Sequence, residues 1–286
     1  MAAPDTNTIV IGTWPYLHCA VTLAALDAGK HVMTEARMAM NAREARLMLE
    51  RSRQKPNLIA QVVPSPFSLR VDRTVQEAIA ARYLGEIYAI DLRGGGSTFA
   101  SLDGPLHWRH DRDRSGFNIL NMGIWYEALI RWVGEASRVL ALSKVSVKMR
   151  RDEGGVMRVV HVPDHVEVVA DMACGAVAHL QFSAVTGLAP GAEVWLFGRN
   201  GTLRYDQGSQ KLFGGQRGDS ALQEIPIRAD KAGGWRVEEE FVNAIRGRER
   251  ITHTTFEDGV KYMEFTEAVT RSAQTGKAVA LPLGNV

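Results

Sequence analysis

The chain has 286 residues, 45% hydrophobic and 23% charged, a composition typical of a globular protein with one large core or two moderate ones. Its 34 basic and 32 acidic side chains give a net charge of +2, so no basic surface field argues for a nucleic-acid partner. No apolar run reaches the roughly 18 residues that a membrane helix needs. Residues 1–7 are polar and lack the apolar core of a signal peptide. We therefore expect a cytoplasmic protein that binds neither nucleic acid nor membranes.

Strands and helices alternate in the first part of the chain. The pattern predicts strand, helix, strand, helix, strand and helix at residues 8–12, 18–28, 30–34, 41–53, 58–63 and 68–82. Asn41 and Glu44 have the spacing of a capping box at the start of the second helix. Alternation of this kind is typical of a parallel sheet, whose ligands bind beyond the carboxyl ends of the strands. Those ends are residues 12–15 and 35–37.

The pattern changes after residue 84. A half-exposed strand is expected at 86–93, and no helix pattern follows Gly94-Gly95-Gly96, so a flexible loop is favoured over a phosphate cradle. A polar loop at 100–114 leads into an apolar helix at 117–133. Further strands are predicted at 137–149, 165–172, 175–183, 193–197 and 202–205, with helices at 235–245 and 256–273. Asn200-Gly201 is a strong hairpin signal.

These patterns predict an α/β protein with two domains. Residues 1–84 form a partial Rossmann-like domain with a parallel sheet. Residues 85–286 form an α+β domain with a large, mostly antiparallel open sheet, one side of which faces solvent or another subunit.

The order of elements and several local patterns resemble the Gfo/Idh/MocA family of NAD(P)-dependent sugar and polyol oxidoreductases. The most specific of them is Ala28-Gly29-Lys30-His31-Val32, followed by Glu35. Weaker matches fall in the right order at residues 9–18, 83–87, 123, 256–259, 267–268 and 272–282. The resemblance implies NAD(P) as cofactor and a sugar-like small-molecule substrate. It also implies that residues 85–286 bind substrate and assemble a homo-oligomer through the open sheet.

The sequence departs from the family in its phosphate-binding part. The family's first strand, Gly-rich turn and first helix belong upstream of Ile9, and no Gly-x-Gly-x-x-Gly follows a strand in this chain. That turn presents backbone N–H groups to the pyrophosphate. We therefore expect a shortened or divergent nucleotide-binding domain that lacks the Gly-rich first βαβ unit. Residues 8–12 then form an edge strand.

Two further departures concern catalysis. The family's Glu-Lys-Pro motif reads Glu35-Ala36-Arg37. Arg37 can orient an anion or a hydroxyl, but a guanidinium stays protonated and cannot shuttle a proton. The family's Asp-x-Gly-x-His-x-x-Asp helix has Trp125 in place of the histidine, with Asn121 and Ala128 in place of the carboxylates. Hydride transfer from an alcohol carbon needs a group that accepts the hydroxyl proton, which tryptophan cannot do.

The candidate site residues follow from these matches and departures. The catalytic candidates are Glu35 and the replacement acid/base groups His107 and His110. The candidates for substrate binding are Arg109, from the family's Trp-Arg pair, and Trp125, Asn121 and Tyr126. The cofactor candidates are Thr13, Trp14, Pro15, His18 and Glu35. No spacing of potential ligands predicts a metal site.

Three functions stay open at this point. The first is NAD(P)-dependent oxidation or reduction of a hydroxyl on a sugar- or polyol-like substrate, with the activity of this chain alone in question. The second is a non-redox elimination or isomerisation in the same cleft. The third is a non-catalytic binding or assembly subunit. All three rest on the fold, which does not fix function by itself.

Overall fold

A parallel sheet of three strands forms the first part of the computed structural model, which describes residues 3–284. Its order is β1 (Thr8–Ile11), β2 (His31–Thr34), β3 (Ala60–Val62), connected through α1 (Pro15–Asp27) and α2 (Ala42–Gln54). The Asn41 side chain accepts a hydrogen bond from the Glu44 N–H at 2.9 Å, which confirms the predicted cap of α2. β1 lies at the edge of this sheet, and Val10 is 63% exposed.

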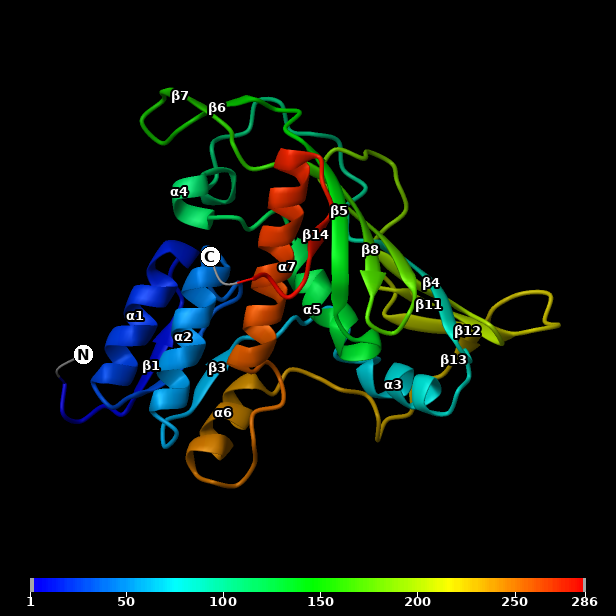
Figure 1. Ribbon diagram of the computed structural model, residues 1–286, viewed down its shortest axis with the longest axis horizontal. Coiled ribbons are helices and arrows are strands. Elements are labelled where there is room, and N and C mark those ends of the chain that lie inside the picture. Colours follow the sequence, from blue (N-terminus) through cyan, green and yellow to red (C-terminus); the bar gives the residue numbers. More distant parts are fainter. Residues whose placement is uncertain (1–2, 285–286) are drawn as a thin grey trace.

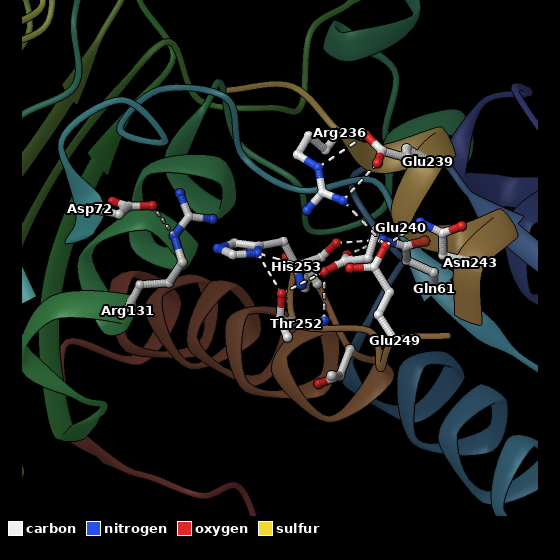
Figure 2. Close-up of polar contacts among 12 residues, drawn as sticks. Gln61, Asp72, Arg131, Arg236, Glu239, Glu240, Asn243, Glu249, Thr252 and His253 are labelled. Carbon is white, nitrogen blue, oxygen red and sulfur yellow. Dashed lines mark hydrogen bonds and ion pairs between the residues drawn. The ribbon is translucent and has the colours of Figure 1, made fainter. Parts of the chain in front are cut away.

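Residues from the end of the chain complete this first sheet. Val62 and Thr254 exchange backbone hydrogen bonds of 3.0 and 3.2 Å, so the segment before α7 (Phe256–Thr275) lies beside β3. Figure 2 shows Glu240 of α6 (Val237–Ile245) at the centre of the local polar contacts. It accepts hydrogen bonds from the Gln61 amide at 2.9 Å and the Thr252 N–H at 3.0 Å. The expected division at residue 84 stays a prediction, but the C-terminal part also packs on the N-terminal sheet.

The second sheet has nine strands, and every neighbouring pair is antiparallel except β4 and β9. Its order is β13 (Gln223–Ile225), β12 (Lys211–Gln216), β11 (Gly201–Asp206), β10 (Glu193–Gly198), β4 (Ile87–Arg93), β9 (Val177–Ser183), β8 (His165–Met172), β5 (Ala136–Lys144), β14 (Val279–Ala280). The Asn200-Gly201 hairpin joins β10 to β11, as predicted. The expected fold class, a parallel Rossmann-like sheet followed by a mostly antiparallel open sheet, is confirmed.

Helix α7 lies between the two sheets and packs on α2, α5 (Met122–Val133) and β5 (Figure 1). The ring of Tyr126 in α5 stacks on Phe265 of α7 with centroids 3.6 Å apart. α3 (Asp72–Ala80) packs against the other side of α5. Burial of these helices against one face of the second sheet forms the main core and leaves the opposite face of the sheet open.

The region of the polar loop at 100–114 contains two short helices that the sequence did not predict, the 3-10 helix η1 (Trp108–His110) and α4 (Arg112–Ser115). A hairpin of β6 (Met149–Arg151) and β7 (Met157–Val159), also not predicted, follows β5. Figure 1 shows these segments above the carboxyl end of the first sheet. None of the helices in residues 3–284 has the length and hydropathy to cross a membrane.

Candidate functional site

A pocket of ≈ 560 Å³ opens at the carboxyl ends of β2 and β3, and its volume is typical of small-molecule sites. It lies where ligands of such sheets bind. The loop after β2, the loop after β3, the loop after β4 and the start of α5 all contribute to it. The lining residues are Glu35, Ala36, Arg37, Val63, Pro64, Pro66, Phe67, Gly94, Gly96, Thr98, Arg109, Leu120, Asn121, Ile124, Ser183, Ala184 and Trp235. Three of the predicted residues, Glu35, Arg109 and Asn121, therefore share one pocket.

The acidic and amide groups in this pocket are available to a ligand. Glu35 is exposed, and its carboxylate accepts a hydrogen bond from the Ala36 N–H at 3.2 Å. Asn121 occupies the N-cap position of α5, but its side chain caps no backbone N–H. The guanidinium carbon of Arg109 lies 4.2 Å from the centroid of the Trp108 ring. This cation–π contact holds the positive charge of Arg109 at the rim of the pocket. Among residues 3–284, Glu35 is the one carboxylate that lines this pocket.

Arg37 lines the same pocket and is only 5% exposed. Among residues 3–284 its guanidinium makes no hydrogen bond or ion pair, and Nε is buried without a partner. Gly123 of α5 gives the side chain room, because a Cβ at that position would lie 3.3 Å from Arg37 Cδ. Burial, together with the charge of Arg109, lowers the pKa of Arg37 to about 10, so the group stays cationic at neutral pH.

His18 is fully buried and connects the ends of the first two strands. Its Nδ1 lies 3.0 Å from the carbonyl oxygen of Arg37, and its Nε2 lies 2.8 Å from that of Thr13. It does not line the pocket. The structure therefore gives His18 a positioning role for the backbone around Arg37.

The unfolding midpoint should fall as the pH drops from neutral toward 5. Burial lowers the pKa of His18 in the folded protein, so the unfolded chain takes up its proton at a higher pH. Its contribution to stability is complete above the unfolded pKa of about 6.5 and is lost as the pH falls through the folded value. Thermal unfolding of His18→Gln, compared with the chain itself across this range, should show a smaller pH dependence. His161→Gln, at an exposed position, is the control, and an equal loss of pH dependence in both variants would contradict the assignment.

His107 and His110 lie outside the pocket. The Arg109 N–H donates to Nδ1 of His107 at 3.3 Å, and the His107 N–H donates to Nδ1 of His110 at 3.2 Å, so both rings cap η1. His107 lines a separate pocket of ≈ 160 Å³. Burial, with Arg109 near His107 and Arg150 near His110, lowers the pKa of both rings. The two rings therefore support the Arg109 loop, and neither lines the larger pocket, so their catalytic role stays a prediction.

The cofactor candidates after β1 meet the same loop. Trp14 stacks on Trp108 with centroids 6.2 Å apart, and Arg114 lies over the Trp14 ring at 4.6 Å. Thr13 and Pro15 are exposed and buried, respectively, and neither lines the pocket. The turn after β1 therefore holds the Arg109 loop against the first sheet.

Trp125 and Tyr126 lie in the core, each with 1% of its surface exposed. Trp125 packs on Phe67 with ring centroids 4.7 Å apart, behind the pocket wall, and the Tyr126 hydroxyl accepts a hydrogen bond from the Ala136 N–H at 2.8 Å. The physical reason is that α5 is covered by the second sheet, α7 and α3, so neighbouring positions around the helix are buried together. Neither residue lines the pocket, in contrast to the expected cleft positions, and their role in substrate binding stays a prediction.

A buried charge cluster supports the pocket wall. Glu127 of α5 accepts hydrogen bonds from the Ser65 N–H at 2.9 Å and from Arg131 at 2.8 Å. Arg131 also pairs with Asp72 at 2.9 Å, and Figure 2 shows these two side chains facing each other. Burial raises the pKa of Glu127, whereas Arg131 opposes the shift. The signal in the sequence was an acidic and a basic residue four positions apart within an apolar helix.

Two family models match successive parts of the chain. The model described as an oxidoreductase family with an NAD-binding Rossmann fold matches residues 1–62, and the model of the GFO/IDH/MocA C-terminal domain matches residues 73–204. The chain belongs to the Gfo/Idh/MocA family of oxidoreductases.

Curated relatives in this family act on sugars and related diols. The chain is 28% identical to a 1,5-anhydro-D-fructose reductase of Ensifer adhaerens over 98% of its own length and 81% of that protein. It is also 28% identical to a levoglucosan dehydrogenase of Pseudarthrobacter phenanthrenivorans, over 53% of its length and 39% of the relative. A trans-1,2-dihydrobenzene-1,2-diol dehydrogenase of Bos taurus is 30% identical over 54% of the chain and 43% of that protein.

Solved structures of the family share the fold. A levoglucosan dehydrogenase in complex with NADH and L-sorbose has a TM-score of 0.87 and 22% identity, over 98% of this chain and 81% of that one. An oxidoreductase domain protein from Kribbella flavida has a TM-score of 0.86 and 18% identity, over the same shares. Identities at this level support the fold alone.

The residues at the pocket suit the nicotinamide half of a dinucleotide better than its pyrophosphate half. The open edge beyond β1 and β2, with Glu35 and the 560 Å³ pocket beside it, suits a nicotinamide ring. The phosphate half is different. The helix after β1 begins with Pro15, which has no N–H, and Trp14 provides no side-chain cap. Within residues 3–284 no Gly-rich turn leads from a strand into a helix, so the described residues do not form a pyrophosphate cradle.

Proposed function

We propose that the chain contributes the substrate pocket of an NAD(P)-dependent oxidoreductase that acts on a hydroxyl of a sugar- or polyol-like compound. The observation that carries the proposal is the ≈ 560 Å³ pocket at the carboxyl end of the parallel sheet, lined by Glu35, Arg109 and Asn121. Membership of an oxidoreductase family with sugar-active relatives supports it. The nicotinamide, when bound, exchanges the hydride; the residues of the chain bind and orient the substrate.

Three polar residues of the pocket have roles in this proposal. Arg109 and Asn121 donate hydrogen bonds to substrate hydroxyls. Glu35 accepts the hydroxyl proton, because it is the carboxylate in the pocket and the family's lysine position is Ala36. The replacement set therefore differs from the histidines His107 and His110 that the sequence suggested.

We propose that the open face of the second sheet pairs with a second copy of the chain. Leu140 lies directly opposite Val169, and these side chains are 47% and 50% exposed. Leu142 and Val177, on the same face, are 72% and 51% exposed. Exposed apolar side chains gathered on one sheet face favour an interface. Light scattering after size exclusion should give a multimer that Leu142→Asp shifts toward the monomer, and a monomer before the substitution would contradict the proposal.

The activity is tested by two measurements on one sample. Titration of NADH and NADPH, followed by cofactor fluorescence, should show saturable binding. Incubation with oxidised cofactor and a panel of sugars and polyols should then raise the absorbance at 340 nm. Glu35→Gln should abolish that rise and leave cofactor binding within a few-fold. The absence of both cofactor binding and turnover would overturn the proposal.

One observation favours a second function, a non-redox elimination or isomerisation. Glu35 lies in the pocket, whereas the described residues form no pyrophosphate cradle. Proton abstraction next to a carbonyl needs a carboxylate but no dinucleotide. Exchange of substrate C–H protons for deuterium without added cofactor, lost in Glu35→Gln, would select this function over the first.

A further inference from the structure

The charge balance at the pocket is incomplete. Two cations, Arg37 and Arg109, and one carboxylate, Glu35, are the charged groups that line it, which leaves one net positive charge. Glu35 does not neutralise Arg37. Its carboxylate accepts a hydrogen bond from the Ala36 N–H and forms no ion pair with the Arg37 guanidinium. Arg37 is therefore a buried guanidinium without a counter-charge among residues 3–284.

An unpaired buried guanidinium is costly to the folded protein. Moving a charge out of water is unfavourable by several kcal/mol unless hydrogen bonds and an opposite charge compensate. Elsewhere in the core the chain does compensate, since Arg131 contacts both Glu127 and Asp72. Arg150 is also buried without an ion pair, but it donates to the Gly104 carbonyl oxygen and lies outside the pocket. Arg37 has no partner among residues 3–284 and lines the pocket, which favours a ligand as its partner.

We propose that the pocket takes a sugar-like substrate bearing a carboxylate, such as an aldonic or uronic acid, with the carboxylate held between Arg37 and Arg109. The inference rests on the proposed function and deepens it. The planar guanidinium matches a carboxylate with two parallel N–H···O bonds. A singly charged carboxylate also balances the net charge of the lining groups, whereas a dianionic phosphate leaves a negative excess. Gly123 is part of this site because its missing side chain admits the stem of Arg37.

The test is calorimetric titration of the full chain with matched pairs of sugars, with and without saturating NADH. D-Gluconate is compared with D-glucitol, D-glucuronate with D-glucose, and D-glucose 6-phosphate reports on phosphate. We expect each carboxylate to bind at least roughly tenfold more tightly than its neutral counterpart, as charge-assisted hydrogen bonds predict. Raising the ionic strength should weaken the acids more than the neutral sugars.

Variants separate the two arginines from general effects of charge. Arg37→Gln should remove the preference for the acid, with a much smaller effect on the affinity for the neutral sugar. Arg109→Gln should reduce the preference for the acid over the neutral sugar. This second variant provides the test if Arg37→Gln does not fold. Arg248→Gln, at an exposed position outside the pocket, is the matched control and should change neither affinity.

A stability measurement distinguishes a ligand site from a structural arginine. Arg37→Met should raise the unfolding midpoint of the unliganded chain by several degrees, because it removes an uncompensated buried charge. A structural role predicts a lower midpoint.

The outcomes also separate this inference from the proposed function. Equal binding of acids and neutral sugars, no binding of either, or tighter binding of the phosphate would overturn the inference. Turnover of neutral polyols with NAD(P) and no preference for acids would overturn the inference and leave the proposed function intact. Binding of acids that depends on Arg37, together with no binding of NADH or NADPH, would support the inference and overturn the proposed function.

Discussion

Replacing Glu127 with alanine is expected to lower the free energy of unfolding by roughly 3–5 kcal/mol, the cost of breaking a buried ion pair by removing one partner. Glu127 is 1% exposed and accepts hydrogen bonds from Ser65, Thr254 and Arg131. Its removal leaves Asp72 as the one counter-charge of Arg131 among residues 3–284 and leaves the Ser65 N–H without an acceptor. Denaturant unfolding measures the loss.

The control for this prediction is Glu135→Ala. Glu135 pairs with Lys261 at 2.8 Å, but both side chains are well exposed, so the loss should stay below about 1 kcal/mol. The Glu127 variant should also weaken ligand binding, since Ser65 lies in the loop that forms the pocket wall between Pro64 and Pro66. Equal stabilities for the two variants would show that the buried cluster does not support the fold.

Replacing Trp125 with alanine is expected to cost about 3–5 kcal/mol as well, the range for removing a large aromatic side chain from a core. The indole packs on Phe67, and a Cβ on Gly94 would lie 2.6 Å from it, so it fills the space directly behind two pocket residues. The cavity left in its place removes these contacts, and the pocket wall should lose definition.

Trp235→Ala is the matched comparison for this second variant. Trp235 lines the pocket but is 50% exposed, so its loss should change the unfolding free energy by less than about 1 kcal/mol while it weakens ligand binding. If Trp125→Ala instead kept full stability and lost only affinity, the indole would be a substrate platform, as its place in the family motif suggests.

Most of the architecture was predictable because it depends on local patterns. The alternation of apolar runs and helical periodicity through residue 82 predicted the parallel sheet, and Asn200-Gly201 predicted the hairpin between β10 and β11. β12 was missed because it carries Gly214 and Gly215, which interrupt the alternation of a strand. The pairing of Thr254 with β3 was also missed, since it joins residues almost two hundred positions apart.

The candidate site was predictable only in part, for a related reason. Glu35, Arg109 and Asn121 follow strands or precede a helix at one edge of the fold, so the order of elements brings them together. Whether Trp125 faces the pocket or the core depends on how α5 packs against its neighbours, and the periodicity of the sequence does not reveal this packing. The isolation of Arg37 is likewise a tertiary property, because it requires that no carboxylate from any other segment reaches the guanidinium.

The central claim is that the pocket beyond β2 and β3 binds a sugar-like substrate beside a nicotinamide. A crystal structure of the chain with NADH and D-gluconate tests it most directly. The account predicts the sugar acid between Arg37 and Arg109, with a hydroxyl within hydrogen-bond distance of Glu35 and the nicotinamide ring next to it. Ligand density only at another place, such as the ≈ 520 Å³ pocket between α3 and α6, or at no place in the chain, would contradict it.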